Sequence, residues 1–376
     1  MTHWKQLQKK IKEMNLFQSI SGALSWDQQT NLPPKGATRR SEQLSMLSSL
    51  QHQLLVSTEL EDLLSRCAED CSNLIEQRSI QQLLRSRHKA LSKSKDLVEA
   101  LSLAKSEAIA AWTQAKLDDD YELFAPHLQR LLELSRETAQ GYQISDVLYD
   151  NLLDDYDPGL TSSELQNIFS SLRRELVPFI EEYSNHVPAP TLGHYTNAEL
   201  DKINHHLIRA LGFDINAGRL DTSIHPFTLG TSPNDVRLTT HHDNDNLLSS
   251  IGGTIHECGH GLYEQNLPLE LEAMGLCQAA GCGLHESQSR FYENIIGRSY
   301  EFFEWLAPMI QNITGKNIEA RDLYLAANPV LPSPIRIQAD ECTYNLHIMI
   351  RFEIEQALLS GAIAVKDAAG EWNSLM

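Results

Sequence analysis

The sequence lacks the features that define several large classes of protein. Its 19 glycines and 14 prolines among 376 residues are too few for a fibrous or disordered chain. Its 6 cysteines include no Cys-x-x-Cys pair, so we expect no disulfide framework and instead free thiols in a reducing compartment. There is no apolar run of about 18 residues and no secretory signal at the amino terminus. These absences predict a globular, cytoplasmic protein.

Basic residues are also in the minority. The chain has 31 Lys and Arg against 50 Asp and Glu, which gives a formal net charge of −19. A charge of this sign repels nucleic-acid phosphates and anionic membrane surfaces. We therefore expect neither nucleic acid nor a membrane as a partner.

The first half of the chain is predicted to be helical. From Trp4 to about Asn185, apolar residues recur at intervals of three and four positions. Thr161 and Glu164 have the spacing of a capping box at the start of a helix. One segment, residues 83–117, resembles a single helix with a long apolar stripe, which consists of Leu97, Leu101, Leu103, Ala104, Ile109 and Trp112.

The pattern changes at about Val187, where a stretch rich in Gly, Pro, Asp and His begins. Within it, residues 235–240 alternate polar and apolar side chains, which predicts a short strand with Val236 and Leu238 buried. Helical patterning returns at about residues 246–264, 284–297 and 339–359. We expect a mostly α fold with a small β-sheet near the active site. It would form one domain, residues 1–376, in which residues 1–185 form a helical wall and residues 186–376 hold the sheet and the metal-binding helices.

The segment with the most chemical information is an H-E-x-x-H motif in a predicted helix. His256 and His260 are one helical turn apart on the same face, so both imidazoles could bind one tetrahedral ion. Glu257 could face a water on that ion and accept its proton while the metal polarises a scissile carbonyl. This arrangement suits peptide-bond hydrolysis.

The same helix is unusually rich in glycine. Gly252, Gly253, Gly259 and Gly261 each cost up to about 1 kcal/mol relative to alanine inside a helix. Two explanations account for them. Backbone or substrate lies very close to the helix at the floor of a cleft, or neighbouring helices simply pack tightly against it.

A third ligand is needed, and the next predicted helix offers one. Glu286 follows His260 by 26 residues, which leaves room for a connection and a returning helix. Arg290, one turn later, could orient the carboxylate of Glu286. His285 and Glu264 are alternatives for the third position.

Taken together, several separated motifs make the chain resemble the carboxypeptidase Taq family of thermostable metallocarboxypeptidases. The resemblance covers essentially the whole chain. It implies a mostly helical, saddle-shaped protein with a deep groove, usually a homodimer, that removes C-terminal residues with broad specificity and resists terminal proline. The matching stretches are residues 23–30 (ALSWDQQT), 225–227 (HPF), 235–239 (DVRLT), 256–260 (HECGH), 285–288 (HESQ) and 335–340 (IRIQAD).

The resemblance also implies roles for individual residues. His256, His260 and Glu286 would be the metal ligands and Glu257 the catalytic base. Arg336 would bind the substrate carboxylate, because a guanidinium offers two parallel hydrogen bonds; its alternative role is a salt bridge to Asp340. The remaining assignments are weaker: Tyr344 as an oxyanion donor or an ordinary buried tyrosine, Asp235 and Arg237 as groove-shaping residues or braces of the sheet, and His225 with no defined role.

One departure from the family pattern is visible. Members of the family continue into a Gly-x-x-Gln-Asp-x-His-Trp motif, which this sequence does not contain before it ends at Met376. We therefore expect a zinc-dependent carboxypeptidase in which cobalt or another divalent ion could replace zinc. A catalytically impaired metal-binding remnant or peptide-binding scaffold is the alternative. A further one is an endopeptidase with an open-ended groove, which would also cleave amidated peptides.

Overall fold

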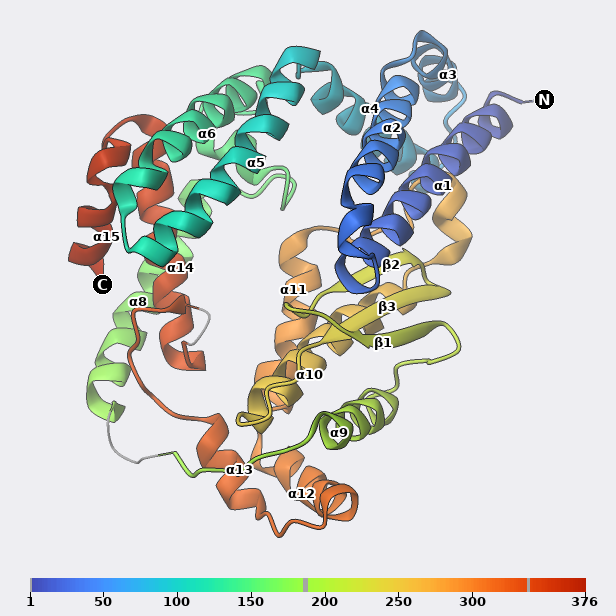
Figure 1. Ribbon diagram of the computed structural model, residues 1–376. Helices are drawn as coiled ribbons and strands as arrows, with labels where there is room; N and C mark the ends of the chain where they lie inside the picture. The colour runs from blue at the N-terminus through green and yellow to red at the C-terminus, as the bar shows by residue number, and fades with distance from the viewer. Residues whose placement is uncertain (1, 185–188, 337–338) are drawn as a thin grey trace. The chain divides into compact units, whose positions relative to one another are not determined.

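The computed structural model describes residues 2–184, 189–336 and 339–376, and within them the chain is mostly helical (Figure 1). The predicted class, a mostly α protein with one small sheet, is confirmed. None of the helices in the described ranges combines the length and apolarity needed to span a bilayer. The predicted boundary between residues 185 and 186, together with Ile337 and Gln338 of the predicted IRIQAD motif, lies outside the described residues.

The chain divides into two compact units. One comprises Met1–Ala90 with Ala189–Asn328, and the other comprises Leu91–Pro188 with Pro329–Met376. The helical elements of the first unit are α1 (His3–Thr30), η1 (Pro34–Gly36), α2 (Ala37–Val56), α3 (Thr58–Glu69), α4 (Leu74–Leu91), α9 (Asn197–Ala210), α10 (Leu247–Gln265), η2 (Leu269–Met274), α11 (Cys282–Arg290), the π-helix η3 (Phe291–Ile296), α12 (Tyr300–Thr314) and α13 (Ala320–Ala327).

The first unit also contains the sheet. Its strands β1 (Gly218–Thr222), β2 (Thr228–Ser232) and β3 (Asp235–Thr240) lie in the order β1-β3-β2. Strand β3 has exactly the predicted bounds, and it pairs parallel to β1 and antiparallel to β2. Val236 and Leu238 are buried as predicted, and they pack with Cys258 and Leu262 of α10. The sheet therefore rests on α10 (Figure 1).

Helix α10 is buried on a second side as well. Leu247, Ile251 and Ile255 join an apolar cluster with side chains of α9 and α12, among them Leu207 and Phe303. A helix that is apolar on two sides is held rigidly by its neighbours, and only a narrow face remains for polar groups. His256 and His260 lie on that face, so the sequence of α10 sets their positions through its apolar residues.

The second unit is helical throughout its described residues. Its elements are α5 (Lys95–Asp118), α6 (Tyr121–Tyr142), α7 (Leu148–Leu153), α8 (Ser162–Tyr183), α14 (Glu341–Ser360), η5 (Val365–Asp367) and α15 (Ala368–Leu375). The predicted capping box at the start of α8 is confirmed, because Thr161 and Glu164 each bond the backbone of the other.

The prediction of one long helix over residues 83–117 is wrong. Helix α4 ends at Leu91, and α5 begins at Lys95 after Ser94, whose hydroxyl accepts a hydrogen bond from the backbone N–H of Leu97. Serine favours such a helix start because its side chain satisfies an N–H that has no partner within the helix. The expected stripe is also only partly buried, because α5 packs on α6 through Leu97 and Ala104 while Leu103, Ile109 and Trp112 remain exposed.

The glycines of α10 have different structural surroundings. A Cβ atom on Gly259 would lie 2.6 Å from the Cα atom of Ser289 in α11, and one on Gly261 would lie 2.7 Å from Leu238. At Gly252 no heavy atom would lie within 4 Å. Tight packing therefore explains Gly259 and Gly261. The close approach at Gly259 also brings α11, and with it Glu286, next to the histidine face of α10.

We predict that Gly259→Ala destabilises the protein, because the new methyl group would meet the backbone of α11 rather than a movable side chain. Overpacking of this kind typically costs about 1–3 kcal/mol. Gly252→Ala is the matched control in the same helix, and it should stabilise the protein by about 0.5–1 kcal/mol, since it meets nothing and favours the helix. Thermal and urea unfolding measure both changes. Equal effects of the two substitutions would contradict this packing.

Candidate metal centre

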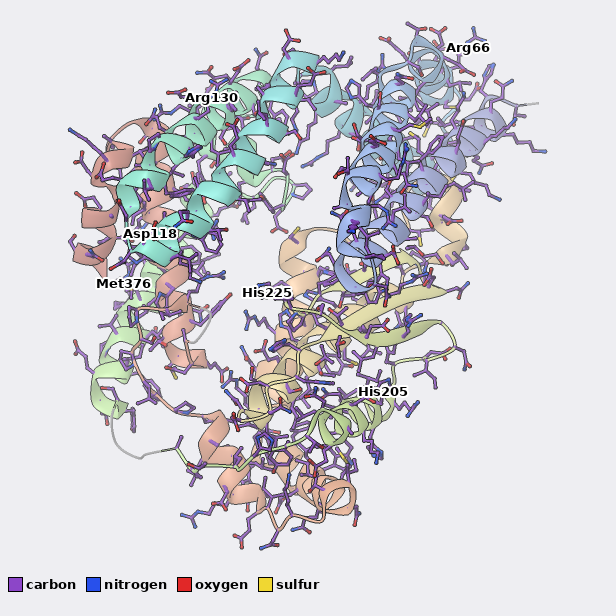
Figure 2. The ribbon with its side chains drawn as sticks, in the orientation of Figure 1. Arg66, Asp118, Arg130, His205, His225 and Met376 are labelled. Carbon is purple, nitrogen blue, oxygen red and sulfur yellow. The ribbon has the colours of Figure 1, made fainter. Side chains whose placement is uncertain are left out.

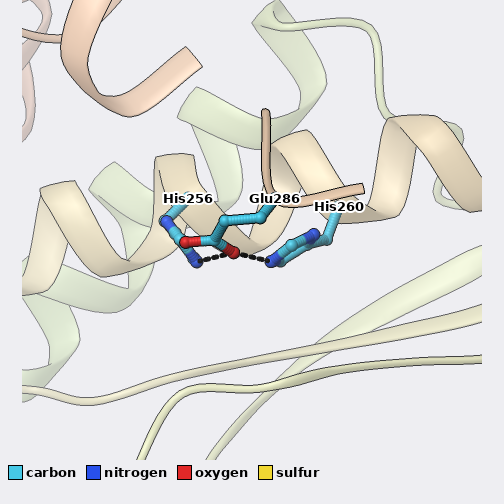
Figure 3. Close-up of side chains that lie close together, drawn as sticks. All are labelled: His256, His260 and Glu286. Atoms are coloured by element: carbon cyan, nitrogen blue, oxygen red, sulfur yellow. Dashed lines mark ion pairs between the residues drawn. The ribbon is translucent and has the colours of Figure 1, made fainter. Parts of the chain in front are cut away.

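Three side chains from α10 and α11 converge on one point (Figure 3). The Nε2 atoms of His256 and His260 lie 3.7 Å and 3.2 Å from Oε2 of Glu286. The three donor atoms all lie within 4.8 Å of one another. In a tetrahedral site with metal–ligand bonds of about 2.0–2.2 Å, donor atoms are about 3.3–3.6 Å apart. The two distances to Glu286 are therefore close to those between the ligands of a small divalent ion. No other group of at least three His, Cys, Asp or Glu side chains in the described ranges meets the 4.8 Å criterion.

A second carboxylate orients His256. Its Nδ1 atom lies 2.8 Å from Oε2 of Glu293, so the opposite nitrogen, Nε2, faces Glu286. This pairing of a carboxylate with the outer nitrogen of a histidine is typical of metal sites, where it fixes the tautomer and the ring orientation. Glu293 lies in the π-helix η3 and was not singled out in the sequence.

Arg290 connects the two carboxylates. Its Nε atom donates a hydrogen bond of 2.9 Å to Oε1 of Glu286, and its Nη1 atom donates one of 2.9 Å to Oε2 of Glu293. The first contact is the one expected from the spacing of these residues on a helix. Because Oε1 is held by Arg290, Oε2 of Glu286 faces the two histidines.

The two alternatives for the third ligand pair with each other. Nε2 of His285 lies 2.9 Å from Oε1 of Glu264. The His285 ring stacks on that of His260, with ring centroids 4.3 Å apart and planes inclined by 19°. The buried Nδ1 atom of His260 has no hydrogen-bonding partner among the described residues.

Glu257 is buried beside this cluster with 7% of its surface exposed. Thr228 of β2 donates a hydrogen bond of 2.7 Å from Oγ1 to Oε2 of Glu257. Burial raises the pKa of the Glu257 carboxyl group above its ordinary value, although the bond from Thr228 and the nearby histidines act in the opposite direction. A carboxylate with a raised pKa is a stronger base than one in water.

The charges around the cluster favour an ionised Glu286. Burial alone would raise its pKa, but the hydrogen bond with His260 and the positive charges of His256 and Arg290 outweigh burial and lower the pKa to about 2. For His256, burial lowers the pKa, but the hydrogen bond and charge of Glu293 outweigh that effect and raise it. The site thus holds an anionic oxygen between two imidazoles, which is one of the donor sets that bind divalent transition-metal ions in proteins.

Asp235 and Arg237 form a bidentate pair on β3. Nε and Nη2 of Arg237 lie 2.8 Å and 3.0 Å from the two carboxylate oxygens of Asp235, and Thr231 donates to the same carboxylate. The hydrogen bonds from Arg237 lower the pKa of Asp235 despite partial burial. His225 is exposed in the connection between β1 and β2 (Figure 2).

Arg336 and Tyr344 belong to the second unit. The Nη1 atom of Arg336 donates a hydrogen bond of 3.0 Å to the hydroxyl of Tyr344. Among the described residues, Arg336 and Asp340 have other partners than each other. The Asp340 carboxylate instead caps α14, where it accepts hydrogen bonds from the backbone N–H groups of Cys342 and Thr343, and it also accepts one from Leu331.

Residues 6–376 match the family described as carboxypeptidase Taq (M32) metallopeptidase. The chain is 34% identical to carboxypeptidase 1 of Bacillus subtilis over 385 residues, which cover 99% of this chain and 76% of that protein. It is also 34% identical to thermostable carboxypeptidase 1 of Thermus thermophilus over 382 residues, or 96% of this chain and 74% of the relative.

Solved structures agree in fold. The crystal structure of the M32 carboxypeptidase from Deinococcus radiodurans has a TM-score of 0.95 and 31% identity, and the match covers all of this chain and 77% of the other. The structure of Pyrococcus furiosus carboxypeptidase gives a TM-score of 0.94 with 32% identity, again over all of this chain and 77% of the other.

We predict that Glu286→Gln lowers the stability of the metal-free protein in a pH-dependent way. Above the ordinary pKa of 4.5 the carboxyl group is ionised in both the folded and the unfolded chain, so its contacts with His260, His256 and Arg290 stabilise the fold. That stabilisation is lost as the pH falls from 4.5 toward the folded-state pKa of about 2.

The difference in melting temperature between parent and variant should therefore be largest at mildly acidic pH, where Glu286 is ionised and His256 is protonated, and should shrink as the pH falls through this window. Thermal unfolding in the presence of a chelator measures it. Glu304→Gln, at an exposed position of α12, is the control. A Glu286→Gln difference that stays constant with pH would contradict the charge contacts described above.

Proposed function

Because the chain belongs to the carboxypeptidase Taq (M32) family of metallopeptidases, we propose that it removes C-terminal amino acids from peptides, with zinc as its metal and broad specificity. The family implies a divalent metal ion and peptide substrates. The observation that carries the proposal is the convergence of three donor atoms within 4.8 Å beside a buried carboxylate, Glu257.

His256, His260 and Glu286 are the proposed ligands. Two imidazoles and one carboxylate are the set that catalytic zinc sites use when a fourth position stays open. The same set accepts cobalt and other divalent ions, so the proposal of zinc rests on the donor chemistry and on the family. Glu293 and Arg290 would orient two of these ligands. Glu293 contacts the nitrogen of His256 that faces away from the cluster, and Arg290 binds the oxygen of Glu286 that faces away from it.

When bound, the ion would polarise the scissile carbonyl and lower the pKa of a water molecule. Glu257 is proposed to accept one proton from the attacking water as its oxygen bonds to the carbonyl carbon. Glu257 then transfers that proton to the leaving nitrogen as the C–N bond breaks. Burial raises the pKa of Glu257, which strengthens it as a base, and leaves only 7% of its surface exposed to water.

Four further residues have proposed roles in substrate recognition. Arg336 offers a guanidinium for the free C-terminal carboxylate, and its bond to Tyr344 would hold it in place. Tyr344 is the proposed donor to the developing oxyanion. Asp235 and Arg237 already form a closed pair, so their proposed role is to shape the surface on which the peptide lies rather than to bind its charge.

The proposal extends to the state of the protein in the cell. We propose that the protein is cytoplasmic and that it forms a homodimer, as the family resemblance implies. Its proposed substrates are unfolded peptides. The net charge of −19 supports the proposal that nucleic acid and anionic membranes are not partners.

We predict that Glu257→Gln binds zinc as tightly as the parent but trims peptides at least about 100-fold more slowly, because the amide cannot accept the proton. Release of C-terminal amino acids from a peptide with a free carboxylate, followed by mass spectrometry, measures the rate. The same peptide with an amidated C-terminus should remain intact. Cleavage of the amidated peptide would instead identify an endopeptidase, and zinc binding without turnover in the parent would identify a catalytically impaired protein.

We predict a graded loss of zinc affinity at three carboxylates. Glu286→Gln removes a proposed ligand and should weaken binding by more than about 100-fold, whereas Glu293→Gln removes a support of His256 and should cost about 10–100-fold. Glu304→Gln should leave the affinity unchanged. Competition with a chromophoric chelator measures all three. If Glu286→Gln binds zinc as the parent does, the ligand set proposed here is wrong.

A further inference from the structure

We propose that Thr228 is a positioning residue for Glu257, one whose hydroxyl orients the catalytic carboxylate so that a single oxygen, Oε1, exchanges the proton. This inference rests on the function proposed above and adds to it a residue outside the metal-binding helices. Thr228 is the first residue of β2, an outer strand of the three-stranded sheet.

The contact itself is short and specific. Oγ1 of Thr228 lies 2.7 Å from Oε2 of Glu257 and 3.0 Å from the backbone oxygen of the same residue. A hydroxyl carries one hydrogen, so it can donate to only one of these atoms at a time. The carboxylate oxygen is closer and charged, and hydrogen bonds to charged acceptors are roughly twice as strong as neutral ones. The hydroxyl therefore donates to the side chain of Glu257.

The other carboxylate oxygen is unengaged. Among the described residues, Oε1 of Glu257 has no hydrogen bond and no ion pair, while Oε2 has only the bond from Thr228. When a donor binds one oxygen of a carboxylate, the lone pairs of the other oxygen stay available to accept a proton. The two oxygens of Glu257 thus have different roles, and Thr228 is what makes them different.

Thr228 is in turn held by the contacts of the preceding residue, Phe227, and by its own pairing with β3. The backbone N–H of Phe227 donates a bond of 2.8 Å to the hydroxyl of Thr239, and the backbone N–H of Thr239 donates one of 2.9 Å to the carbonyl of Phe227. The Phe227 ring packs against Trp26 of α1 with ring centroids 5.2 Å apart. Thr228 itself pairs with Leu238 in the register of the sheet.

This support matters because Glu257 is 7% exposed. A buried carboxylate without hydrogen bonds is destabilised and has no partner that fixes its orientation. Strand β2 supplies the hydroxyl from a rigid sheet, and α1 holds the strand in place through Trp26. The ALSWDQQT and HPF stretches of the sequence, which contain Trp26 and Phe227, thereby support the catalytic residue from outside the metal site.

The test compares two substitutions at this position. Thr228→Val replaces the hydroxyl with a methyl group of almost equal size and suits a β-strand, whereas Thr228→Ser keeps the hydroxyl. We expect Thr228→Val to lower kcat about tenfold or more, with KM and zinc affinity within about twofold of the parent, because hydrogen bonds to charged groups are among the stronger ones. Thr228→Ser should retain kcat within about threefold.

A second measurement needs neither metal nor turnover. In the chelator-treated protein, Thr228→Val should lower the melting temperature more in the parent background than in a Glu257→Ala background, where the carboxylate is absent. This comparison detects the bond even if the parent does not trim peptides, so failure of the present inference and failure of the proposed function can be told apart.

Several outcomes would overturn the inference. An unchanged kcat in Thr228→Val would do so, as would an equal loss in Thr228→Ser, since a substitution that keeps the hydroxyl would then be as harmful as one that removes it. A large loss of zinc affinity in Thr228→Val would show that the residue acts through the metal ligands. Equal melting-temperature changes in the two backgrounds would show that the hydroxyl and the carboxylate do not interact.

Discussion

The site depends on the close approach of two helix backbones. Because Gly259 has no side chain, the backbone of α11 at Ser289 can lie against α10 where a Cβ atom would be only 2.6 Å away. Glu286 lies one turn before Ser289, so the same approach brings its carboxylate to within 3.7 Å of the two histidines. A side chain at position 259 would push α11 away from α10, and the carboxylate of Glu286 would move away from His256 and His260.

The approach also concentrates charge in a partly buried region, since His256, His260 and Glu286 are each of intermediate exposure. Three carboxylates, Glu257, Glu286 and Glu293, lie around two imidazoles, and each has its own neutral or positive partner. Arg290 contacts two of them, and Thr228 contacts the third. The pKa values of the three therefore move in different directions, since Glu286 and Glu293 have positive neighbours within hydrogen-bonding distance whereas Glu257 is dominated by burial. The same residue type is in this way suited to the three proposed roles of ligand, support and base.

The sequence predicted what is encoded locally. The spacing of His256 and His260 follows from helical geometry, the alternation at residues 235–240 predicted β3 to the residue, and the spacing of Arg290 from Glu286 indicated their contact. Glu293 and Thr228 were missed for a physical reason. Glu293 reaches His256 through a π-helical turn, whose periodicity differs from that of the α-helix, and Thr228 reaches Glu257 through the pairing of strands. Neither contact leaves a periodic signal in the sequence. The long helix predicted over residues 83–117 failed for a related reason, since one serine at position 94 is enough to start a new helix.

The arrangement destabilises the fold at the site, and apolar packing elsewhere on α10 offsets this loss. Burying Glu257 and placing glycines within α10 both destabilise the protein locally. The apolar residues of α10 compensate, because Ile251 and Ile255 on one side and Cys258 and Leu262 on another are almost fully buried. Since the same helix carries both the destabilising and the stabilising residues, its position cannot relax without losing apolar contacts. A helix held in this way keeps His256, Glu257 and His260 in one geometry before any ligand is present, which is what a preorganised site requires.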